Sequence, residues 1–423
     1  MNIIIVRSSP HQSIEALGPS QPRLCEKYPF LLDGDTEKVI EPVFRFIFSR
    51  LGFGYNTSLE SGKAWCDDLR DWLYFLDSIN VEWDQVTELH IESFITQSAG
   101  MISPKTGKIY SVRSIERKAT TVVSFYKFAT NAKILQTTID FRWKEQTDRQ
   151  SPSSSVVRGS RSGLIPSKKS CSPLPNIVLP EDYVLLSQTL GLSPSEWEDS
   201  SLDSSRDRLI ADIAVSTGMR IDEVLSLTVF QMTELLTSGL NDLDFIPLYL
   251  TKTKGSKPRF VRLPVWLHKF VMIYINGERQ KCFQRMRTLR DPVSLFLPRL
   301  NAKNIGTTGI GYRTINDLFS KACVKCGFIK TVKPSKPEAG VSQRAVIPLY
   351  SHHDLRHTYA CNFYFQAKAN GDPEPWKILS VLLGHANIDV TINTYLTVVT
   401  AIEGSSAQRK LYEHLQRKLA RQP

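Results

Sequence analysis

The sequence predicts a mainly α-helical protein of two domains, with a small β-hairpin or sheet in the second domain. Three observations support this fold class. A chain of 423 residues is too long for one ordinary hydrophobic core. Apolar residues recur at helical spacing over most of the chain. A stretch rich in Ser, Gly and Pro at 149–170 separates two such regions, as a linker does.

These patterns divide the chain into four segments. They are an unassigned N-terminal segment (1–35), a helical domain (36–148), a basic linker (149–175) and a second domain with a C-terminal helix (176–423). The linker sequence RQSPSSSVVRGSRSGLIPSKKS contains five basic residues and no acidic one. Its charge suits a segment that follows a phosphate backbone while joining two domains.

Two segments of the first domain predict amphipathic helices. In SGKAWCDDLRDWLYFLDSI (61–79) and in SVRSIERKATTVVSFYKFATNAKIL (111–135), apolar residues recur at three- and four-residue steps. The polar positions of the second segment carry Arg113, Arg117 and Lys118. Such a basic face lies either in solvent or along a DNA backbone.

The second domain alternates helical segments with one hairpin. RDRLIADIAVSTGMRIDEVLSLTVFQM (206–232) gives two helical stretches punctuated by Gly218. FIPLYLTKTKGSKPRFVRLPV (245–265) predicts a β-hairpin that turns near 254–258. In the last helical segment, Leu411, Leu415 and Leu419 form a narrow stripe. This stripe either closes the domain's own core or docks on a neighbouring subunit.

Composition narrows the class of partner. The formal net charge is +11, and residues 251–300 hold twelve Lys or Arg against two acidic residues, which favours a polyanion. Because no apolar run is long enough to cross a bilayer, we expect no membrane partner and a cytoplasmic location. Seven cysteines at irregular spacing do not resemble a disulfide framework. The pair Cys323 and Cys326 lacks the second pair that a zinc site needs.

The segment SHHDLRHTYA (351–360) places three of the eight histidines around Arg356. Imidazoles bind metals, but a permanently charged guanidinium repels a divalent cation and suits a phosphate, which it grips through two parallel hydrogen bonds. His353 and Arg356 share a helical face, and His357 lies one turn from His353. We therefore expect a phosphate site here, with no metal and no cofactor.

Four segments of the second domain, in this order, resemble the tyrosine recombinase (phage integrase) family. STGMRIDEVLSL resembles its first arginine box, TKTKGSKPRFVRLP its lysine hairpin, HDLRHTYA its His-x-x-Arg-His box, and LLGHANIDVTINTY its Leu-Gly-His box with the nucleophilic tyrosine. The resemblance extends over about 206–395. The helical region before the linker is similar to the family's core-binding domain. The resemblance implies a two-domain DNA clamp, with a helical core-binding domain and a mixed α/β catalytic domain.

The resemblance also implies a role for each matched residue. Tyr395 would attack a DNA phosphodiester and form a 3′-phosphotyrosyl bond. Arg220 and Arg356 would hold the non-bridging oxygens. Lys254 would protonate the departing 5′-oxygen, with Lys252 and Lys257 as alternatives on either side of the turn. The remaining roles are as follows: His353 accepts or relays the tyrosine proton, His385 binds the phosphate, Glu223 braces Arg220, and His357 supports the site, whereas His352 has no role.

Other cations are expected to bind DNA outside the reacting centre. They are Arg113, Arg117, Lys118, Lys252, Lys257 and Arg259. The lysine-rich segment 327–350 is expected either to add DNA contacts or to be a structural insertion. One departure from the family pattern concerns the nucleophile. Tyr395 follows His385 by ten residues, about one more than the commonest form, which predicts a slightly shifted helix.

The sequence therefore predicts a site-specific DNA recombinase. We expect a bacterial, nucleoid-associated integrase of a mobile element that acts as a homotetramer on paired double-stranded sites, with an accessory DNA-binding or recombinase partner. A recombinase that resolves chromosome or plasmid dimers shares the same chemistry. A tyrosine-type topoisomerase would need only one subunit. A non-catalytic DNA-binding protein is disfavoured, because all six catalytic positions are present.

Overall fold

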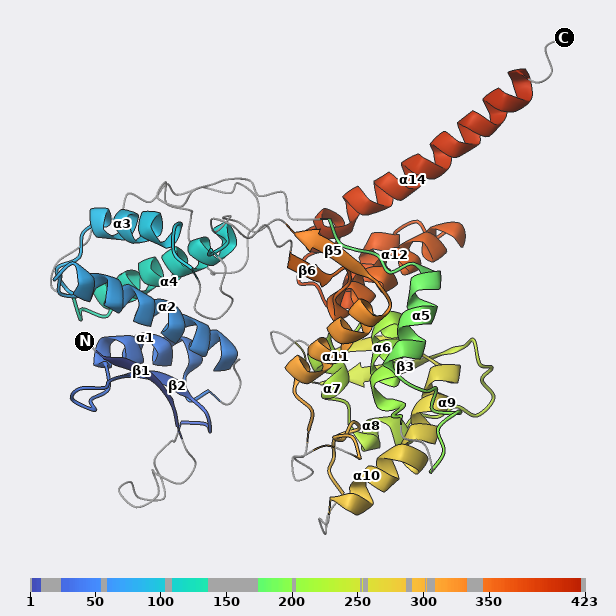
Figure 1. The fold of residues 1–423 in the computed structure, drawn as a ribbon, viewed down its shortest axis with the longest axis horizontal. Coiled ribbons are helices and arrows are strands. Elements are labelled where there is room, and N and C mark those ends of the chain that lie inside the picture. Colours follow the sequence, from blue (N-terminus) through green and yellow to red (C-terminus); the bar gives the residue numbers. More distant parts are fainter. Residues whose placement is uncertain are drawn as a thin grey trace. The chain divides into compact units, whose positions relative to one another are not determined.

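The computed structural model of the chain forms two compact units, unit 1 (Met1–Cys171) and unit 2 (Ser172–Pro423) (Figure 1). Their boundary falls inside the predicted linker. The structure describes residues 2–8, 24–54, 59–102, 109–135, 174–199, 203–251, 253, 258–286, 291–300, 302, 309–332 and 345–419, the last fifteen by their backbone alone. Most of the linker therefore lies outside the described residues. Each unit has its own hydrophobic core and is considered by itself.

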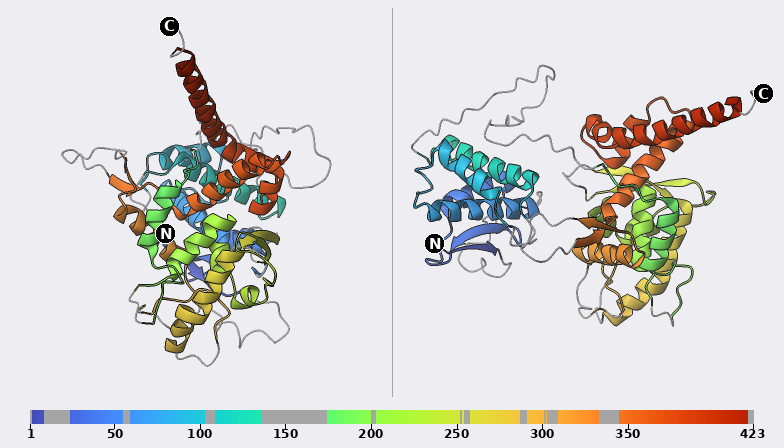
Figure 2. Two further views of the ribbon diagram at one scale, coloured as in Figure 1. Left: turned by 90° about the vertical axis from the view of Figure 1, so that its right-hand side faces the viewer. Right: turned by 45° about the horizontal axis from the view of Figure 1, so that its top comes forward.

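Unit 1 packs a two-stranded sheet against helices (Figure 2). Its elements are β1 (Ile3–Arg7), β2 (Pro29–Asp33), α1 (Glu41–Leu51), α2 (Leu59–Ser78), α3 (Glu88–Ser98) and α4 (Val112–Asn131). The strands are antiparallel and pair Ile5 with Leu31. Leu31 is fully buried in the same core as Trp72 of α2 and Tyr126 of α4. The N-terminal segment that matched no sequence pattern therefore supplies part of the core.

Unit 2 is built mainly from helices, with two antiparallel hairpins in its described part (Figure 1). The elements before the second hairpin are α5 (Pro180–Leu190), α6 (Arg206–Thr217), α7 (Ile221–Leu225), α8 (Val229–Thr233), β3 (Phe245–Leu250), β4 (Arg259–Pro264), α9 (Val265–Tyr274), η1 (Ile275–Arg279), α10 (Gln280–Arg285) and α11 (Tyr312–Lys325). Then follow β5 (Ile329–Val332), β6 (Ala345–Pro348), α12 (His352–Ala369), α13 (Pro375–Leu383) and α14 (Ile388–Leu419). The predicted mainly α-helical fold with a small β component is confirmed.

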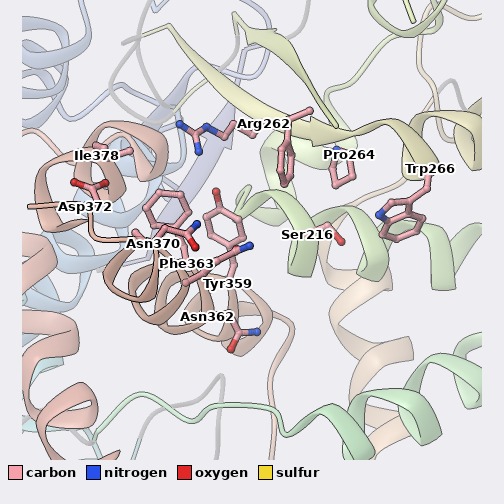
Figure 3. A pocket seen from close by; sticks show the side chains of 13 residues that line it. Ser216, Arg262, Pro264, Trp266, Tyr359, Asn362, Phe363, Asn370, Asp372 and Ile378 are labelled. Carbon is pink, nitrogen blue, oxygen red and sulfur yellow. The ribbon is translucent and has the colours of Figure 1, made fainter. Parts of the chain in front are cut away.

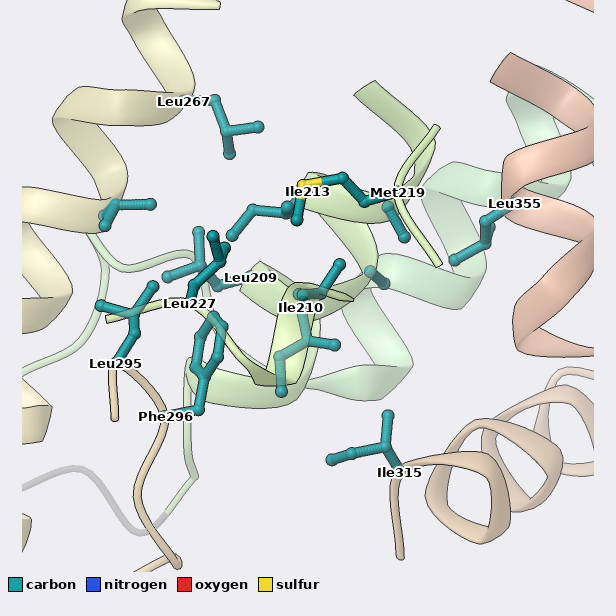
Figure 4. Close-up of a cluster of buried hydrophobic side chains, with 14 of the residues drawn as sticks. Leu209, Ile210, Ile213, Met219, Leu227, Leu267, Leu295, Phe296, Ile315 and Leu355 are labelled. Carbon is teal, nitrogen blue, oxygen red and sulfur yellow. The ribbon is translucent and has the colours of Figure 1, made fainter. Parts of the chain in front are cut away.

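Helix α6 is the centre of the main core of unit 2. Leu209, Ile210 and Ile213 are fully buried, and Leu227 and Phe296 from other elements belong to the same cluster (Figure 4). Burial of this apolar surface contributes about 25 cal/mol per Å² and fixes the direction in which α6 ends. That end carries Gly218 and leads directly into Arg220.

Both strands of the hairpin β3–β4 alternate between buried and exposed residues. Leu248 and Val261 face the core, whereas Tyr249 and Phe260 pair across the exposed face. Residues 252 and 254–257 of the turn lie outside the described residues. The segment 327–350 also forms a hairpin, with Ile329 paired to Pro348, and its residues 333–344 are likewise not described.

Helices α12, α13 and α14 form a second cluster of buried residues. Leu379 and Leu383 of α13 pack with Val399 of α14 and Ala360 of α12, and Tyr395 lies among them. The C-terminal part of α14 extends away from the other elements of unit 2 (Figures 1 and 2). None of the helices in the described residues combines the length and the apolarity needed to cross a membrane.

Candidate active site

Glu223 is the centre of a buried group of charges, which we call the arginine cluster (Arg220, Glu223, Arg259 and Arg356). Its Oε1 accepts hydrogen bonds from Arg220 Nη1 at 3.0 Å and from Arg259 Nη1 at 2.8 Å. Its Oε2 accepts from Arg259 Nη2 at 2.7 Å and lies 4.0 Å from Arg356 Nη1. Burial alone raises the pKa of Glu223, but the hydrogen bonds and charges of Arg259 and Arg220 outweigh burial and lower it. Glu223 is therefore ionised at neutral pH.

A tight turn places Arg220 in this cluster. Helix α6 ends at Gly218, which has a φ of 67°, in the left-handed region that glycine adopts without strain. A Cβ there would lie 2.3 Å from the ring of Tyr359. Arg220 then precedes α7, and its backbone N–H donates to Glu223 Oε2 at 2.8 Å. The backbone N–H of Arg220 is therefore engaged inside the protein, whereas its guanidinium stays partly exposed.

Arg356 of α12 joins the turn after α6 to the end of α13. Its Nη1 donates to the Gly218 carbonyl oxygen at 2.6 Å, and its Nη2 donates to that of Leu383 at 2.5 Å. The residue is only 2% exposed. Burial and the neighbouring charge of Arg220 lower the pKa of Arg356 to about 9, so the guanidinium stays charged at neutral pH. Three guanidinium groups thus share one carboxylate, and the cluster carries surplus positive charge.

His385 follows α13 beside Arg356. Gly384 ends the helix with a φ of 67°, and a Cβ at this position would lie 2.9 Å from Cδ of Arg259. The His385 Nε2 lies 3.4 Å from Arg356 Nη2, and its Nδ1 lies 2.7 Å from Oγ1 of Thr391 on α14. Burial, followed by the charge of Arg356, lowers the pKa of His385 to about 4. The imidazole is therefore neutral when it faces the arginines.

Tyr395 of α14 points into the same region but is only 1% exposed. Its hydroxyl lies 3.0 Å from Nδ1 of His357, and the two rings meet at an angle of 66°. Burial raises the pKa of Tyr395 to about 12, although Arg356 and Arg220 act in the opposite direction. Burial and the nearby charge of His353 lower the pKa of His357 to about 4. The hydroxyl is protonated and its partner is a neutral imidazole.

The three histidines of α12 have separate environments. His353 is exposed, and its ring centroid lies 4.7 Å from that of His357. His352 is buried against Phe319, and burial lowers the pKa of His352 to about 4. His352 thus contributes to the core and faces away from the group around Tyr395. Within the described ranges, no three His, Cys, Asp or Glu side chains are grouped closely enough to hold a metal ion.

The predicted hairpin cations divide into two sets. Lys254, Lys252 and Lys257 lie outside the described residues. Arg259, which the sequence assigned to DNA binding, is 8% exposed, and its Nε donates to the Leu382 carbonyl oxygen at 2.8 Å. All three of its nitrogen groups are engaged inside the protein. The structure therefore differs from the prediction, because Arg259 holds Glu223 and the end of α13 together.

The predicted DNA-binding cations of α4 also differ from one another. Arg113 is exposed, as predicted. The exposed Arg117 donates to the buried Asp68 at 2.5 Å. Lys118 is 4% exposed, pairs with Asp71 and lies 4.0 Å from the ring centroid of Tyr110. Lys118 therefore stabilises the packing of α4 on α2, which is not the placement that a phosphate contact requires.

A separate cavity of about 410 Å³ lies beside α12. Tyr359 and Phe363 from α12 and Arg262 from β4 line it (Figure 3), and the Arg262 guanidinium lies 5.7 Å from the centroid of the Phe363 ring. The described lining residues do not include Arg220, Glu223 or Arg356. This cavity is therefore distinct from the arginine cluster.

Comparison with known proteins assigns the chain to a family. Residues 195–401 match the model of the phage integrase family, and this range contains every residue of the arginine cluster together with Tyr395. This chain belongs to the phage integrase family. It is a tyrosine recombinase, an enzyme of site-specific recombination that breaks and rejoins DNA strands.

Relatives of this tyrosine recombinase match most of its length. "Tyrosine recombinase XerC" of Listeria innocua serovar 6a is 24% identical over 345 residues, which cover 81% of this chain and 89% of the relative. A tyrosine recombinase of Pseudothermotoga lettingae is 24% identical over 352 residues, covering 83% and 91%. The structure of the XerH site-specific recombinase in a post-cleavage complex with a palindromic difH substrate has a TM-score of 0.53 and 14% identity. The match covers 89% of this chain and 91% of that chain. At this identity the similarity to XerH shows a common fold.

Sequence reasoning missed two contacts of this recombinase. The first is the pairing of Arg259 with Glu223. A signal for it exists, because strand alternation places Arg259 on the same face as the buried Val261 and Leu263. The second is the contact between His357 and Tyr395. The sequence offers no signal that selects His357 over His353, since both lie on one face of α12.

Proposed function

We propose that the protein cleaves and rejoins DNA at a specific site through a covalent 3′-phosphotyrosyl intermediate. The observation that carries this proposal is the placement of Tyr395 within reach of a surplus of guanidinium charge. Tyr395 contacts His357, which directly follows Arg356 on α12, and the charges of Arg356 and Arg220 oppose the rise in the pKa of the Tyr395 hydroxyl. A phosphate bound by the same two arginines would therefore be near the hydroxyl.

The reaction is a transesterification. The Tyr395 oxygen forms a bond to phosphorus while the bond from phosphorus to the 5′-oxygen breaks, and the departing oxygen takes a proton from Lys254. A 5′-hydroxyl of a partner duplex later reverses the step and displaces Tyr395. Because one phosphodiester is exchanged for another ester, the bond energy is conserved and the reaction needs no ATP.

The arginine cluster supports catalysis through charge. Arg220 and Arg356 hold the non-bridging oxygens and neutralise the negative charge that grows in the transition state. His385 binds the same phosphate. The bonds from Glu223 and from backbone carbonyls fix both guanidinium groups before the substrate arrives, so little reorganisation is required during the reaction.

Double-stranded DNA containing a recombination site is the proposed substrate, bound by a homotetramer on two paired sites, with an accessory protein as a further partner. We assign integration or excision of a mobile element as the biological role, because the basic linker and the segments 1–35 and 327–350 resemble none of the four family motifs. Resolution of chromosome or plasmid dimers is the second candidate. It is favoured by the similarity to relatives named XerC over most of their length.

The test uses duplexes from the DNA that flanks this gene, nicked near candidate inverted repeats so that a cleaved strand cannot be resealed. We expect a covalent adduct on a denaturing gel, mapped by peptide analysis to Tyr395 at a 3′-phosphate. Tyr395→Phe should bind the duplex and form no adduct. Tyr312→Phe is the matched control, because Tyr312 is exposed on α11 and lies outside the site. An adduct on another residue would overturn the assignment.

A second assay separates recombination from relaxation of supercoils. A plasmid that carries two copies of the trapped site should yield strand-exchange products whose linkage depends on both copies. A topoisomerase would relax a plasmid without any site, as a single subunit and without exchanging strands. Relaxation without exchange at every protein concentration would contradict the recombinase proposal.

A further inference from the structure

In the structure, the hydroxyl of the nucleophile contacts the second histidine of the family motif. The contact that involves the Tyr395 hydroxyl is with Nδ1 of His357, at 3.0 Å, within the range of a good hydrogen bond. His353 instead lies on the outer side of His357, exposed, with its ring edge-on to that of His357. The three side chains therefore lie in the order Tyr395, His357, His353.

Packing explains why His357 occupies the inner position. Ala360, Cys361 and Tyr364 lie three, four and seven residues after His357 and are buried in the cluster that contains Tyr395, so this face of α12 turns toward α14. His353 lies one helical turn earlier, at the solvent edge of the same face.

We propose that His357 is a catalytic residue that takes the proton from the Tyr395 hydroxyl during attack, and that His353 relays this proton to solvent. This proposal rests on the proposed function. In the step, the O–H bond of Tyr395 breaks and its proton moves to His357 Nδ1. The electron pair left on oxygen forms the bond to phosphorus, the bond to the 5′-oxygen breaks, and Lys254 supplies the proton for that oxygen.

The electrostatic surroundings of the pair agree with this division of roles. His357 is uncharged at neutral pH, because burial and His353 lower its pKa to about 4. A neutral imidazole has one nitrogen without hydrogen, which accepts the phenol proton. Since the pKa of Tyr395 is about 12, the proton stays on the tyrosine until a phosphate is attacked. The negative charge that then develops on the phosphate stabilises the imidazolium.

The test compares adduct formation on the nicked duplex by His357→Gln, His357→Ala and His353→Ala. The Gln side chain accepts a hydrogen bond but does not take up a proton. We expect both His357 variants to form the Tyr395 adduct about 10² to 10⁴ times more slowly, the usual contribution of a general base. His353→Ala should be affected less. DNA binding of all three variants, measured over a range of salt, shows that each remains folded.

A more acidic nucleophile distinguishes proton transfer from positioning. Replacement of Tyr395 by difluorotyrosine lowers the pKa of the phenolic hydroxyl. In that background the penalty of His357→Ala should shrink by at least about tenfold if His357 takes the proton. An unchanged penalty would overturn the proposal, as would a normal rate in His357→Gln. Absence of adduct in the unaltered protein would contradict the proposed function itself, so the two failures are distinguishable.

Discussion

In unit 1, carboxylates and cations balance where α2 packs on α4, whereas in unit 2 three guanidinium groups surround the single carboxylate of Glu223. We call the first group the α2–α4 ion cluster (Asp68, Asp71, Arg117 and Lys118), to which Arg70 and Asp67 add one further charge of each sign. Each cluster contains buried charges, Asp68 and Lys118 in unit 1 and Glu223, Arg259 and Arg356 in unit 2. The difference lies in the charge left over, which is close to zero in unit 1 and positive in unit 2.

The two clusters also affect their acids in opposite directions. Burial raises the pKa of Asp68 to about 6 despite Arg117 and Thr121, and its Oδ1 is buried with no hydrogen-bond partner among the described residues. Glu223 has all of its acceptor positions directed at donors, and its pKa is lowered. A balanced cluster joins two helices, whereas surplus positive charge prepares a site for a phosphate.

The largest effect is expected from Arg356→Ala. This variant removes the charge from the phosphate site and the bonds to the Gly218 and Leu383 carbonyl oxygens. Adduct formation on the nicked duplex should slow by about a thousandfold or more, which corresponds to about 4 kcal/mol. Quenched time courses measure the rate at saturating protein. Cleavage at a near-normal rate would remove Arg356 from the site.

Glu223→Gln should have the next largest effect, on both rate and stability. The variant leaves Arg259 buried beside Arg220 without a counter-charge. Breaking such a buried pair costs about 3 kcal/mol of unfolding free energy. We expect cleavage to slow by about tenfold to a hundredfold because Arg220 loses its brace. Affinity for DNA should not fall, because the variant gains positive charge. Weaker DNA binding, measured by fluorescence anisotropy, would mean that Glu223 has a different role.

The α2–α4 ion cluster should instead determine how the unfolding free energy of unit 1 depends on pH. The pKa of Asp68 is raised from an ordinary value of 3.8 to about 6, so the folded state binds more protons than the unfolded state between these values. The unfolding free energy of unit 1 therefore falls as pH rises from about 4 to about 6. This fall in the unfolding free energy amounts to up to about 3 kcal/mol, and Asp68→Asn should remove it.

Hydrogen exchange measures this effect where it arises. Amide protection of α2 and α4 should vary with pH less in Asp68→Asn than in the unaltered protein, after correction for intrinsic exchange. Peptides from α6 in unit 2 serve as the internal control. Parallel pH curves for the two proteins would show that Asp68 titrates alike in the folded and unfolded chain.

The smallest effect is expected on α4, where the exposed Arg113 is compared with the buried Lys118. Arg113→Ala should reduce the slope of log K against log salt by about 1, with a severalfold loss of affinity, if Arg113 contacts a phosphate. Lys118→Met should leave this slope unchanged, because Lys118 already pairs with Asp71. Anisotropy titrations at several salt concentrations measure both. Equal changes in slope would mean that burial does not decide which cations of α4 reach DNA.

Local patterns in the sequence predicted much of the fold and of the chemistry. Apolar spacing predicted α2 and α4, because each buries one face, and a denser run of apolar residues predicted α6, which is buried on most sides. The hairpin β3–β4 was predicted from an apolar strand before a turn and an alternating strand after it. The residues around the reacting phosphate were predicted because the order of four short segments is specific. The contacts that surround these residues could not be predicted from the sequence.

Long-range packing determined what the sequence did not predict. Strands β1 and β2 are five residues each and pair across more than twenty residues, so neither carries a strong local signal. Lys118 and Arg259 were predicted to bind DNA, because their acidic partners come from other elements and leave no local signal. Whether His353 or His357 meets Tyr395 depends on how α14 packs against α12. A change of one residue in the spacing before Tyr395 rotates its position by about 100° around the helix.

The central claim is that the surplus charge of the arginine cluster neutralises the scissile phosphate. A nicked duplex with a methylphosphonate at the cleavage position tests it directly, because one charged oxygen is replaced by a methyl group. Arg356→Ala should cleave the ordinary phosphodiester about a thousandfold more slowly than the unaltered protein does. On the methylphosphonate, the cleavage rates of the two proteins should agree within about tenfold. An equal loss on both substrates would contradict the account.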